Sequence, residues 1–340
     1  MRLVLVLAAL VSTAVPALAA ENRSTFYKGM TVSCQTWGIE WQMPEMEKTL
    51  DELKSLGVNS IAIHPYAQIR EDGQVVSRRR AGASTTHITT PLRWARERGM
   101  SAMLIPHIAY WGTKFTWRGE INFVTPEEWD RFFSEYETWI VEMATLAEAE
   151  HAELFCVGLE FSYAQKYEER WRKIIAAVRA VYHGKVTYGA NWNEYADVKF
   201  WDALDYLGVL AYFPLTKTTD PMASEIASAW ETRCAELDKF SKQNGRPFLF
   251  VEIGYNESAR AAAEPWAFKT GGEHAAEIQQ RCIDVALGLP AKHPFLAGMF
   301  WWKWFPKIPH HEEENYRLQT EPIKALIAKR WNGAGPPSGR

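Results

Sequence analysis

The sequence LFCVGLE at residues 154–160 and the sequence FLFVE at residues 248–252 are the two stretches that decide the fold. Each is a short, nearly continuous apolar run that ends in a single carboxylate. Apolar runs of this length are typical of strands buried on both faces, as in a parallel sheet that helices cover. They therefore predict an α/β protein in which a charged side chain emerges where each of two buried strands ends.

Further apolar runs alternate with amphipathic helical patterns along the rest of the chain. We predict strands at residues 29–33, 60–64, 101–106, 154–159, 186–190, 206–211, 248–251 and 296–301. We predict helices at residues 44–56, 91–98, 126–149, 168–182, 223–244, 273–289 and 320–331. This alternation fits a single closed (β/α)8 barrel, the TIM barrel, better than an open doubly wound sheet. No GxGxxG or GxxxxGK[ST] motif follows any strand, which argues against a dinucleotide or P-loop site.

Two predicted helices have sequence patterns that mark where they begin. TPEE at residues 125–128 is a capping box with proline in the first helical position. Thr90 followed by Pro91 predicts an N-cap and a first helical residue for the second helix.

Composition excludes some partners and suggests others. The net charge of -3 provides no general attraction for phosphates, so we expect no nucleic acid partner. The chain has 16 Trp beside 13 Tyr and 16 Phe. Tryptophan presents a flat apolar face that suits sugar rings, although large barrels also bury many aromatic residues as core.

The two ends of the chain are set apart from the predicted barrel. Residues 1–19 have the pattern of a secretory signal peptide, with Arg2, an apolar segment and the small-x-small sequence ALA at 17–19. A retained N-terminal anchor is the alternative. We expect export to the periplasm or the extracellular space, a barrel domain at residues 20–332 without a membrane span, and a disordered Gly/Pro-rich tail at residues 333–340.

The cysteines and histidines do not form a recognised metal pattern. The four cysteines are Cys34, Cys156, Cys234 and Cys282, and no CxxC pair occurs. Cys234 and Cys282 lie on consecutive predicted helices, so either a disulfide between them or two buried free thiols is open. His310 and His311 precede three glutamates, but adjacent residues seldom converge on one ion. We expect no metal and no cofactor.

The two strand-end carboxylates, Glu160 and Glu252, are the candidate reactive groups. In a TIM barrel the reactive groups lie at the carboxyl ends of the strands. A carboxylate there costs free energy unless it has a partner or a chemical task, and a structural salt bridge would explain one of them. Two of them, on strands four and seven, fit hydrolysis of a glycosidic bond, where one carboxyl protonates the departing oxygen and the other attacks the anomeric carbon.

The motifs around these carboxylates resemble those of glycoside hydrolase family 113, in clan A. The similar segments are WRG at 117–119, GLEF at 158–161, WR at 171–172, VR at 178–179, VTYGANW at 186–192, FWD at 200–202, DYLG at 205–208, AYFPL at 211–215 and WKW at 302–304. The resemblance covers most of residues 26–330. It implies a retaining endo-β-1,4-mannanase acting on mannan-type polysaccharides or oligosaccharides, with Glu160 as acid/base and Glu252 as nucleophile. We separately expect the protein to be a monomer. Two alternatives remain: a clan A hydrolase acting on β-glucan or another cell-envelope glycan, and a non-catalytic glycan-binding barrel.

Several neighbours of the carboxylates are candidate substrate contacts. Tyr212, at the end of strand six, is expected to donate a hydrogen bond to Glu252 and keep it ionised, unless it is only an aromatic core residue. Trp302 or Trp304 is expected to form a sugar platform, with Trp301 turned into the barrel wall by strand alternation.

One departure from the clan pattern concerns the sugar 2-hydroxyl. Clan A enzymes usually have Asn directly before the acid/base, and this chain has Leu159 there. Asn191 or Asn193 is the candidate replacement. The remaining expected contacts to the glycan are Trp37, His107, Trp117 and Arg118.

Overall fold

The computed structural model describes residues 26–77, 84–307 and 316–332. The expected signal peptide, the His310–His311 pair and the C-terminal tail lie outside these described residues.

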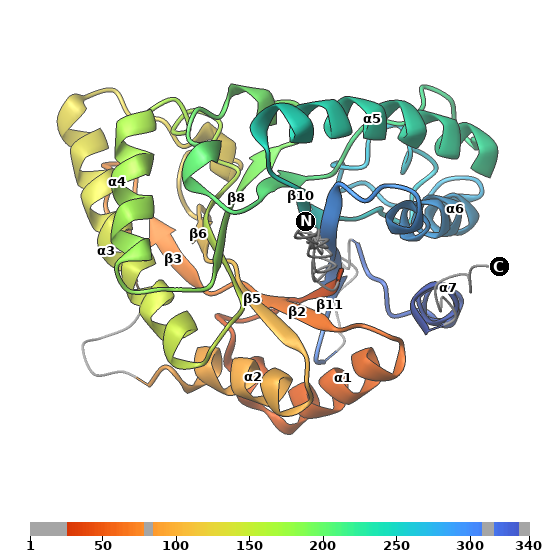
Figure 1. Cartoon of the computed structure of the whole chain (residues 1–340), viewed down its shortest axis with the longest axis horizontal. Coiled ribbons are helices and arrows are strands. Elements are labelled where there is room, and N and C mark those ends of the chain that lie inside the picture. The colour runs from red at the N-terminus through yellow and green to blue at the C-terminus, as the bar shows by residue number, and fades with distance from the viewer. Residues whose placement is uncertain (1–25, 78–83, 308–315, 333–340) are drawn as a thin grey trace, which may run out of the picture.

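Eight parallel strands close into a barrel in the order β1-β11-β10-β9-β8-β7-β5-β2. They are β1 Tyr27–Val32, β2 Ser60–Ile63, β5 Ser101–Leu104, β7 Leu154–Leu159, β8 Lys185–Asn191, β9 Leu207–Leu210, β10 Phe248–Ile253 and β11 Leu296–Trp304. Helices surround the strands on the outside (Figure 1). The predicted (β/α)8 barrel is therefore confirmed.

The helices follow the predicted pattern closely. They are α1 Pro44–Ser55, α2 Thr86–Glu97, α3 Pro126–Ala149, α4 Glu168–Arg179, α5 Ala223–Asn244, α6 Ala275–Leu287 and α7 Glu321–Asn332. After β8 the chain makes only two short 3-10 turns, at Tyr195–Asp197 and Trp201–Ala203. The capping box of α3 is present, because the Thr125 hydroxyl accepts from the Glu128 amide at 3.2 Å and the Glu128 carboxylate accepts from the Thr125 amide at 2.9 Å.

The predicted start of α2 is wrong. The helix begins at Thr86, so Pro91 lies inside it rather than at its first position. Ile88 and Leu92 are both buried and are four residues apart, so the additional turn adds Ile88 to the apolar face of the helix. The burial of this side chain outweighs the single backbone hydrogen bond that Pro91 cannot donate.

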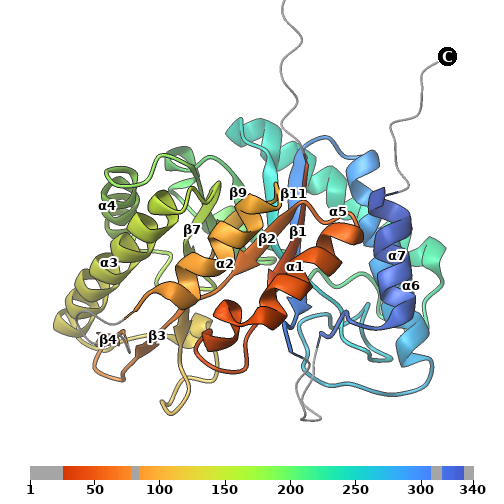
Figure 2. The ribbon, with the colours of Figure 1, turned by 90° about the horizontal axis from the view of Figure 1, so that it is seen from below.

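A small second sheet, absent from the sequence prediction, extends one side of the barrel. It contains β3 Tyr66–Ile69, β4 Val75–Val76 and β6 His107–Ala109 in the order β4-β3-β6. The strands β3 and β6 continue the chain beyond β2 and β5, and Figure 2 places β3 and β4 at the lower edge of the molecule, away from β1 and α7. The parallel pairing aligns Tyr66 with His107, which brings both residues to the rim.

The apolar core has two parts, and neither contains a disulfide. One part lies between the strands and the helices, and the other fills the barrel with side chains that include Met103, Cys156, Leu249 and Phe300. All four cysteines are free, so the suggested Cys234–Cys282 bridge is not formed, although both thiols are buried. Within the described residues no helix is long and apolar enough to cross a membrane, and no group of His, Cys, Asp or Glu is arranged to hold a metal ion.

Candidate active site

Glu252 lies near the end of β10 and is almost completely buried, with 5% of its surface exposed. The Tyr212 hydroxyl donates a hydrogen bond to Glu252 Oε2 at 3.2 Å, as the sequence predicted. Burial, together with the nearby charge of Glu160, raises the pKa of Glu252 to about 8. Arg118, the Tyr212 hydroxyl and Lys303 act in the opposite direction but are outweighed. The Tyr212 hydroxyl therefore favours the ionised form of this carboxyl, as expected, but it acts against the larger effect of burial.

Glu160 directly follows β7 and has a strained backbone. Its φ is 61°, in the left-handed region that residues with a side chain seldom adopt. Two backbone hydrogen bonds hold it there: its amide donates to the Gly189 carbonyl of β8 at 2.9 Å, and its carbonyl accepts from the Ser162 amide at 3.0 Å. The carboxylate forms an ion pair with Arg118 Nη1.

Arg118 connects Glu160 to the small sheet. It lies in the short 3-10 helix Arg118–Glu120, and its Nε donates to the Ile108 carbonyl at 2.9 Å. Its Nη2 lies 3.0 Å from His107 Nδ1. Because arginine can only donate, this histidine nitrogen accepts, and the neutral ring carries its proton on Nε2. Burial, with the positive charge of Arg118 and the ring of His64 nearby, holds the pKa of His107 well below its usual value.

The rings of His64 and His107 are stacked, with centroids 4.8 Å apart. The Trp302 ring lies beside both, 5.9 Å from His107 and 5.2 Å from His64. Burial and the charges of Arg118 and Lys303 lower the pKa of His64 to about 3. His64 was not among the site residues predicted from the sequence, although it ends the second predicted strand in the same way as His107 follows the third.

The three tryptophans at residues 301–304 differ in burial. Trp302 is half-buried and faces the histidine pair, whereas Trp304 is completely buried and cannot offer a face to a sugar. The reason is that β11 continues to Trp304, which pairs with Val32 after a register shift and packs against the helix layer. Trp301 is buried in the wall, as predicted.

Two further neighbours of Glu252 come from the C-terminal part of the chain. Burial lowers the pKa of Lys303 to about 8, although the negative charge of Glu252 raises it. The ring of Tyr316 lies 5.7 Å from the ring of Tyr212. No sequence pattern marked Tyr316, whereas Lys303 lies between the two tryptophans that we had considered.

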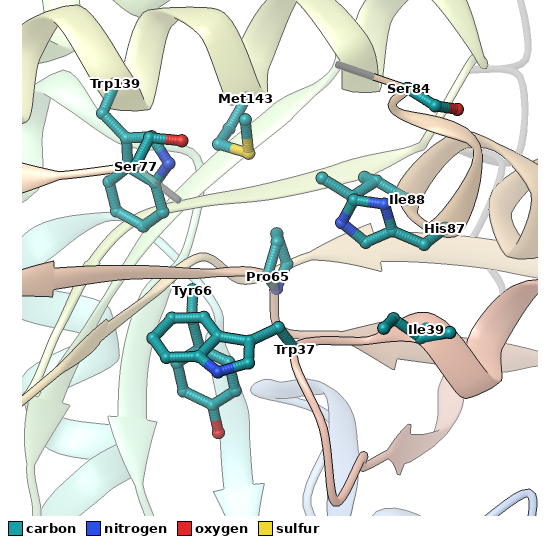
Figure 3. A pocket seen from close by; sticks show the side chains of 10 residues that line it. All are labelled: Trp37, Ile39, Pro65, Tyr66, Ser77, Ser84, His87, Ile88, Trp139 and Met143. Atoms are coloured by element: carbon teal, nitrogen blue, oxygen red, sulfur yellow. The ribbon is translucent and has the colours of Figure 1, made fainter. Parts of the chain in front are cut away.

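Trp37 lies at the outer part of the site. Its ring is 5.8 Å from Tyr66 and 6.0 Å from Trp111. Trp37 and Tyr66 line one side of a cavity of about 220 Å³, and Trp139 and Met143 line the other (Figure 3). Neither Glu160 nor Glu252 lines this cavity, so it does not contain the reactive groups.

The remaining candidates are spread along the rim. Trp117, with 36% of its surface exposed, directly precedes Arg118. Asn191 ends β8 and is buried, and its Nδ2 donates to Ser162 Oγ at 3.0 Å and to Glu194 Oε2 at 3.1 Å. Asn193 is exposed in the following turn. The Asn191 amide protons are thus already directed at protein oxygens.

Comparison with known proteins identifies the family. The family model described as Glycoside Hydrolase Family 113 matches residues 30–319, most of the chain. This protein belongs to glycoside hydrolase family 113. It is therefore a glycoside hydrolase, and the sequence resemblance is confirmed.

Solved structures agree with this family 113 assignment. The GH113 β-mannanase AaManA from Alicyclobacillus acidocaldarius is 25% identical, with a TM-score of 0.78 over 91% of this chain and 98% of that chain. A second GH113 β-1,4-mannanase has a TM-score of 0.79 at 23% identity, covering 91% of this chain and 100% of the other. A family 5 mannosidase from Rhizomucor miehei shares the fold, at 12% identity and a TM-score of 0.58 over 91% of this chain and 94% of that chain. A comparison with curated proteins gives no match.

Proposed function

We propose that this family 113 enzyme hydrolyses β-1,4-linked mannan-type polysaccharides or oligosaccharides with retention of anomeric configuration. Glu160 is the acid/base and Glu252 the nucleophile. The observation that carries the proposal is the placement of two carboxyls at the same end of the barrel, with Glu160 directly after β7 and Glu252 near the end of β10, close enough for the charge of Glu160 to raise the pKa of Glu252. The two family 113 structures named as mannanases support the choice of sugar.

In the first step a Glu252 oxygen attacks the anomeric carbon while the glycosidic carbon–oxygen bond breaks. Glu160 transfers its proton to the departing oxygen, so the leaving sugar departs neutral. This step requires that the single proton shared by the pair resides on Glu160. The Tyr212 hydroxyl and Lys303 lower the pKa of Glu252 and thereby favour that arrangement.

In the second step water attacks the same carbon and the bond to Glu252 breaks. Glu160 now acts as base and takes the water proton, which returns both carboxyls to their starting states. Arg118, fixed by the Ile108 carbonyl and by His107, holds Glu160 in one position through both steps. Trp302 provides the sugar platform, and Trp37, Trp117, Asn191 and Asn193 are further candidate contacts.

The proposal includes where the enzyme works. The catalytic domain spans residues 20–332, residues 1–19 are removed during export, and the mature enzyme acts as a monomer in the periplasm or outside the cell. Its substrate is the only partner that this proposal requires.

The test is product analysis with the purified enzyme on mannan, glucomannan, β-glucan and xylan oligosaccharides, with the anomeric configuration of new reducing ends followed by NMR. We expect cleavage of the mannan-type substrates and an initial β-anomer. Cleavage of glucan or xylan alone would overturn the sugar assignment. An initial α-anomer would overturn the retaining mechanism, and no cleavage at all would favour a glycan-binding barrel.

A further inference from the structure

Two tryptophans from different loops form a stacked pair at the rim. Trp192 directly follows β8, and Trp266 lies in the loop that follows β10, the strand of Glu252. Their ring centroids are 5.3 Å apart and their planes differ by 19°. Trp192 is half-buried against the side chains that fill the barrel, whereas 43% of Trp266 is exposed. The pair therefore anchors a large exposed aromatic surface to the top of the barrel interior.

Trp266 is held in place by the residues that surround the nucleophile. The Tyr316 hydroxyl donates to the Pro265 carbonyl at 2.5 Å, directly before this tryptophan. The Asn256 side chain donates to the Ala267 carbonyl directly after it, and accepts from the Tyr316 amide at 2.6 Å. Because Asn256 is buried, these bonds fix the backbone on both sides of Trp266. A surface fixed in this way loses little conformational entropy when a ligand binds.

The order of strands places Trp192 on the acid/base side of the site, and Trp266 reaches it from the loop after β10 by stacking on its ring. Trp192 follows β8, which pairs with β7, the strand that ends before Glu160. Trp302 belongs to β11, which pairs with β10, the strand of Glu252. The sugar attacked by Glu252 would lie toward Trp302, and the departing sugar, which receives the proton of Glu160, would lie toward Trp192.

We propose that Trp192 and Trp266 form a binding platform for the departing, aglycone part of the glycan chain, where the exposed face of Trp266 stacks on a pyranose ring. The inference rests on the proposed function, because it assumes that Glu160 protonates the glycosidic oxygen. Trp192 packs against the same barrel-filling cluster as Tyr212, and Tyr316, which neighbours Tyr212, braces the loop of Trp266; this connection to the site favours the substrate over a separate protein partner. The enzyme thus binds its glycan on both sides of the scissile bond.

The experiment compares Trp266→Ala with the unmodified enzyme on two substrates. One is mannohexaose, which needs an aglycone site, and the other is a dinitrophenyl β-mannobioside, whose leaving group departs without one. We expect Trp266→Ala to lower kcat/KM for mannohexaose by about tenfold more than for the aryl glycoside, because only mannohexaose loses the stacking contact with the indole ring. Trp266→Phe keeps a ring and should recover part of the difference.

A matched control lies on the same loop. Phe268 is 70% exposed and meets Tyr316 at a ring distance of 6.3 Å, outside the stacked pair, so Phe268→Ala should leave the ratio between the substrates unchanged. Equal losses on both substrates, or no loss on either, would overturn the aglycone platform. If the unmodified enzyme cleaves only another sugar, the proposed function fails, and the same pair of measurements with that sugar still decides the role of Trp266.

Discussion

Asp205 and Glu252 are carboxyls at opposite ends of the same barrel, and their pKa values are shifted in opposite directions. Burial alone would raise the pKa of Asp205, but the Val186 amide and Arg179 outweigh it, and the pKa is lowered. The amide lies 2.9 Å and the guanidinium 2.6 Å from the carboxylate, and Lys185 lies 3.4 Å away. Glu252, in contrast, has one hydroxyl at 3.2 Å, and its pKa is raised.

This difference distinguishes a carboxylate that stabilises the fold from a carboxyl that serves the reaction. At the amino-terminal end of the barrel, Asp205 is neutralised by groups from β8 and α4, so ionisation there stabilises the fold. At the carboxyl-terminal end, no cation within the described part of the chain forms an ion pair with Glu252, and its charge is costly until a substrate arrives. In TIM barrels, residues that stabilise the fold commonly lie at the amino-terminal end of the strands, and catalytic residues lie at the carboxyl-terminal end.

The largest expected effect comes from removing the reactive carboxyl. Glu252→Ala should lower kcat/KM on mannan oligosaccharides by about 10⁴-fold or more, because no glycosyl-enzyme bond can form. Added azide should restore turnover and give a glycosyl azide of inverted configuration, which NMR detects. Activity close to that of the unmodified enzyme would show that Glu252 is not the nucleophile.

The second prediction compares stability at the two ends. Asp205→Asn should lower the free energy of unfolding by about 1–3 kcal/mol at pH 7, because Arg179 and Lys185 lose their partner. This contribution is present above the unfolded pKa of aspartate and is lost as the pH falls through the lower folded pKa. Glu252→Gln should instead raise the free energy of unfolding. The raised pKa of Glu252 in the folded state makes the unmodified protein lose stability as the pH rises from the unfolded pKa toward about 8, and glutamine removes this loss.

Thermal unfolding across pH 5 to 9 measures both effects. We expect the gain in Tm from Glu252→Gln to grow with pH, and the loss from Asp205→Asn to persist at neutral and alkaline pH while activity per folded molecule is retained. A destabilising Glu252→Gln at pH 8 would contradict the contrast between the two ends.

The smallest expected effect is a shift in a pH profile. Glu160→Gln removes the charge that helps to raise the pKa of Glu252. The rate at which a 2-fluoro mannosyl fluoride labels Glu252 should therefore begin to fall at a lower pH on the acid limb of its pH profile. The limb should stay above the usual glutamate value, because burial is the larger cause and remains. Asp205→Asn is the control, and an unmoved limb in Glu160→Gln would show that the two carboxyls are not coupled.

The parts of the molecule that the sequence predicted are those that depend on local patterns. Strands β7 and β10 were recognisable because each apolar run and its terminal glutamate are contiguous in the chain. Tyr316 was not recognisable, because it reaches Tyr212 from a segment more than a hundred residues away and no periodic pattern marks it. Trp304 was misplaced because a register shift against β1, which no single strand reveals, turned it into the helix layer.

The size and direction of the pKa shifts of the buried site residues also could not be predicted from the sequence. The hydrogen bond from Tyr212 to Glu252 followed from strand positions, but its effect depends on burial and on the distance to Glu160, both set by the closed barrel. The pKa values of His64 and His107 are lowered for the same kind of reason, because the closed barrel buries both rings next to the charge of Arg118.

The left-handed backbone of Glu160 has a consequence for anyone who tries to make this enzyme more robust. Glycine, and to a lesser degree asparagine, adopts that conformation more readily, so a design that only relieves backbone strain would favour them at this position. Such variants would lose the proton donor and leave the Arg118 guanidinium without its carboxylate partner. Screens for improved forms of this enzyme therefore have to score turnover together with survival.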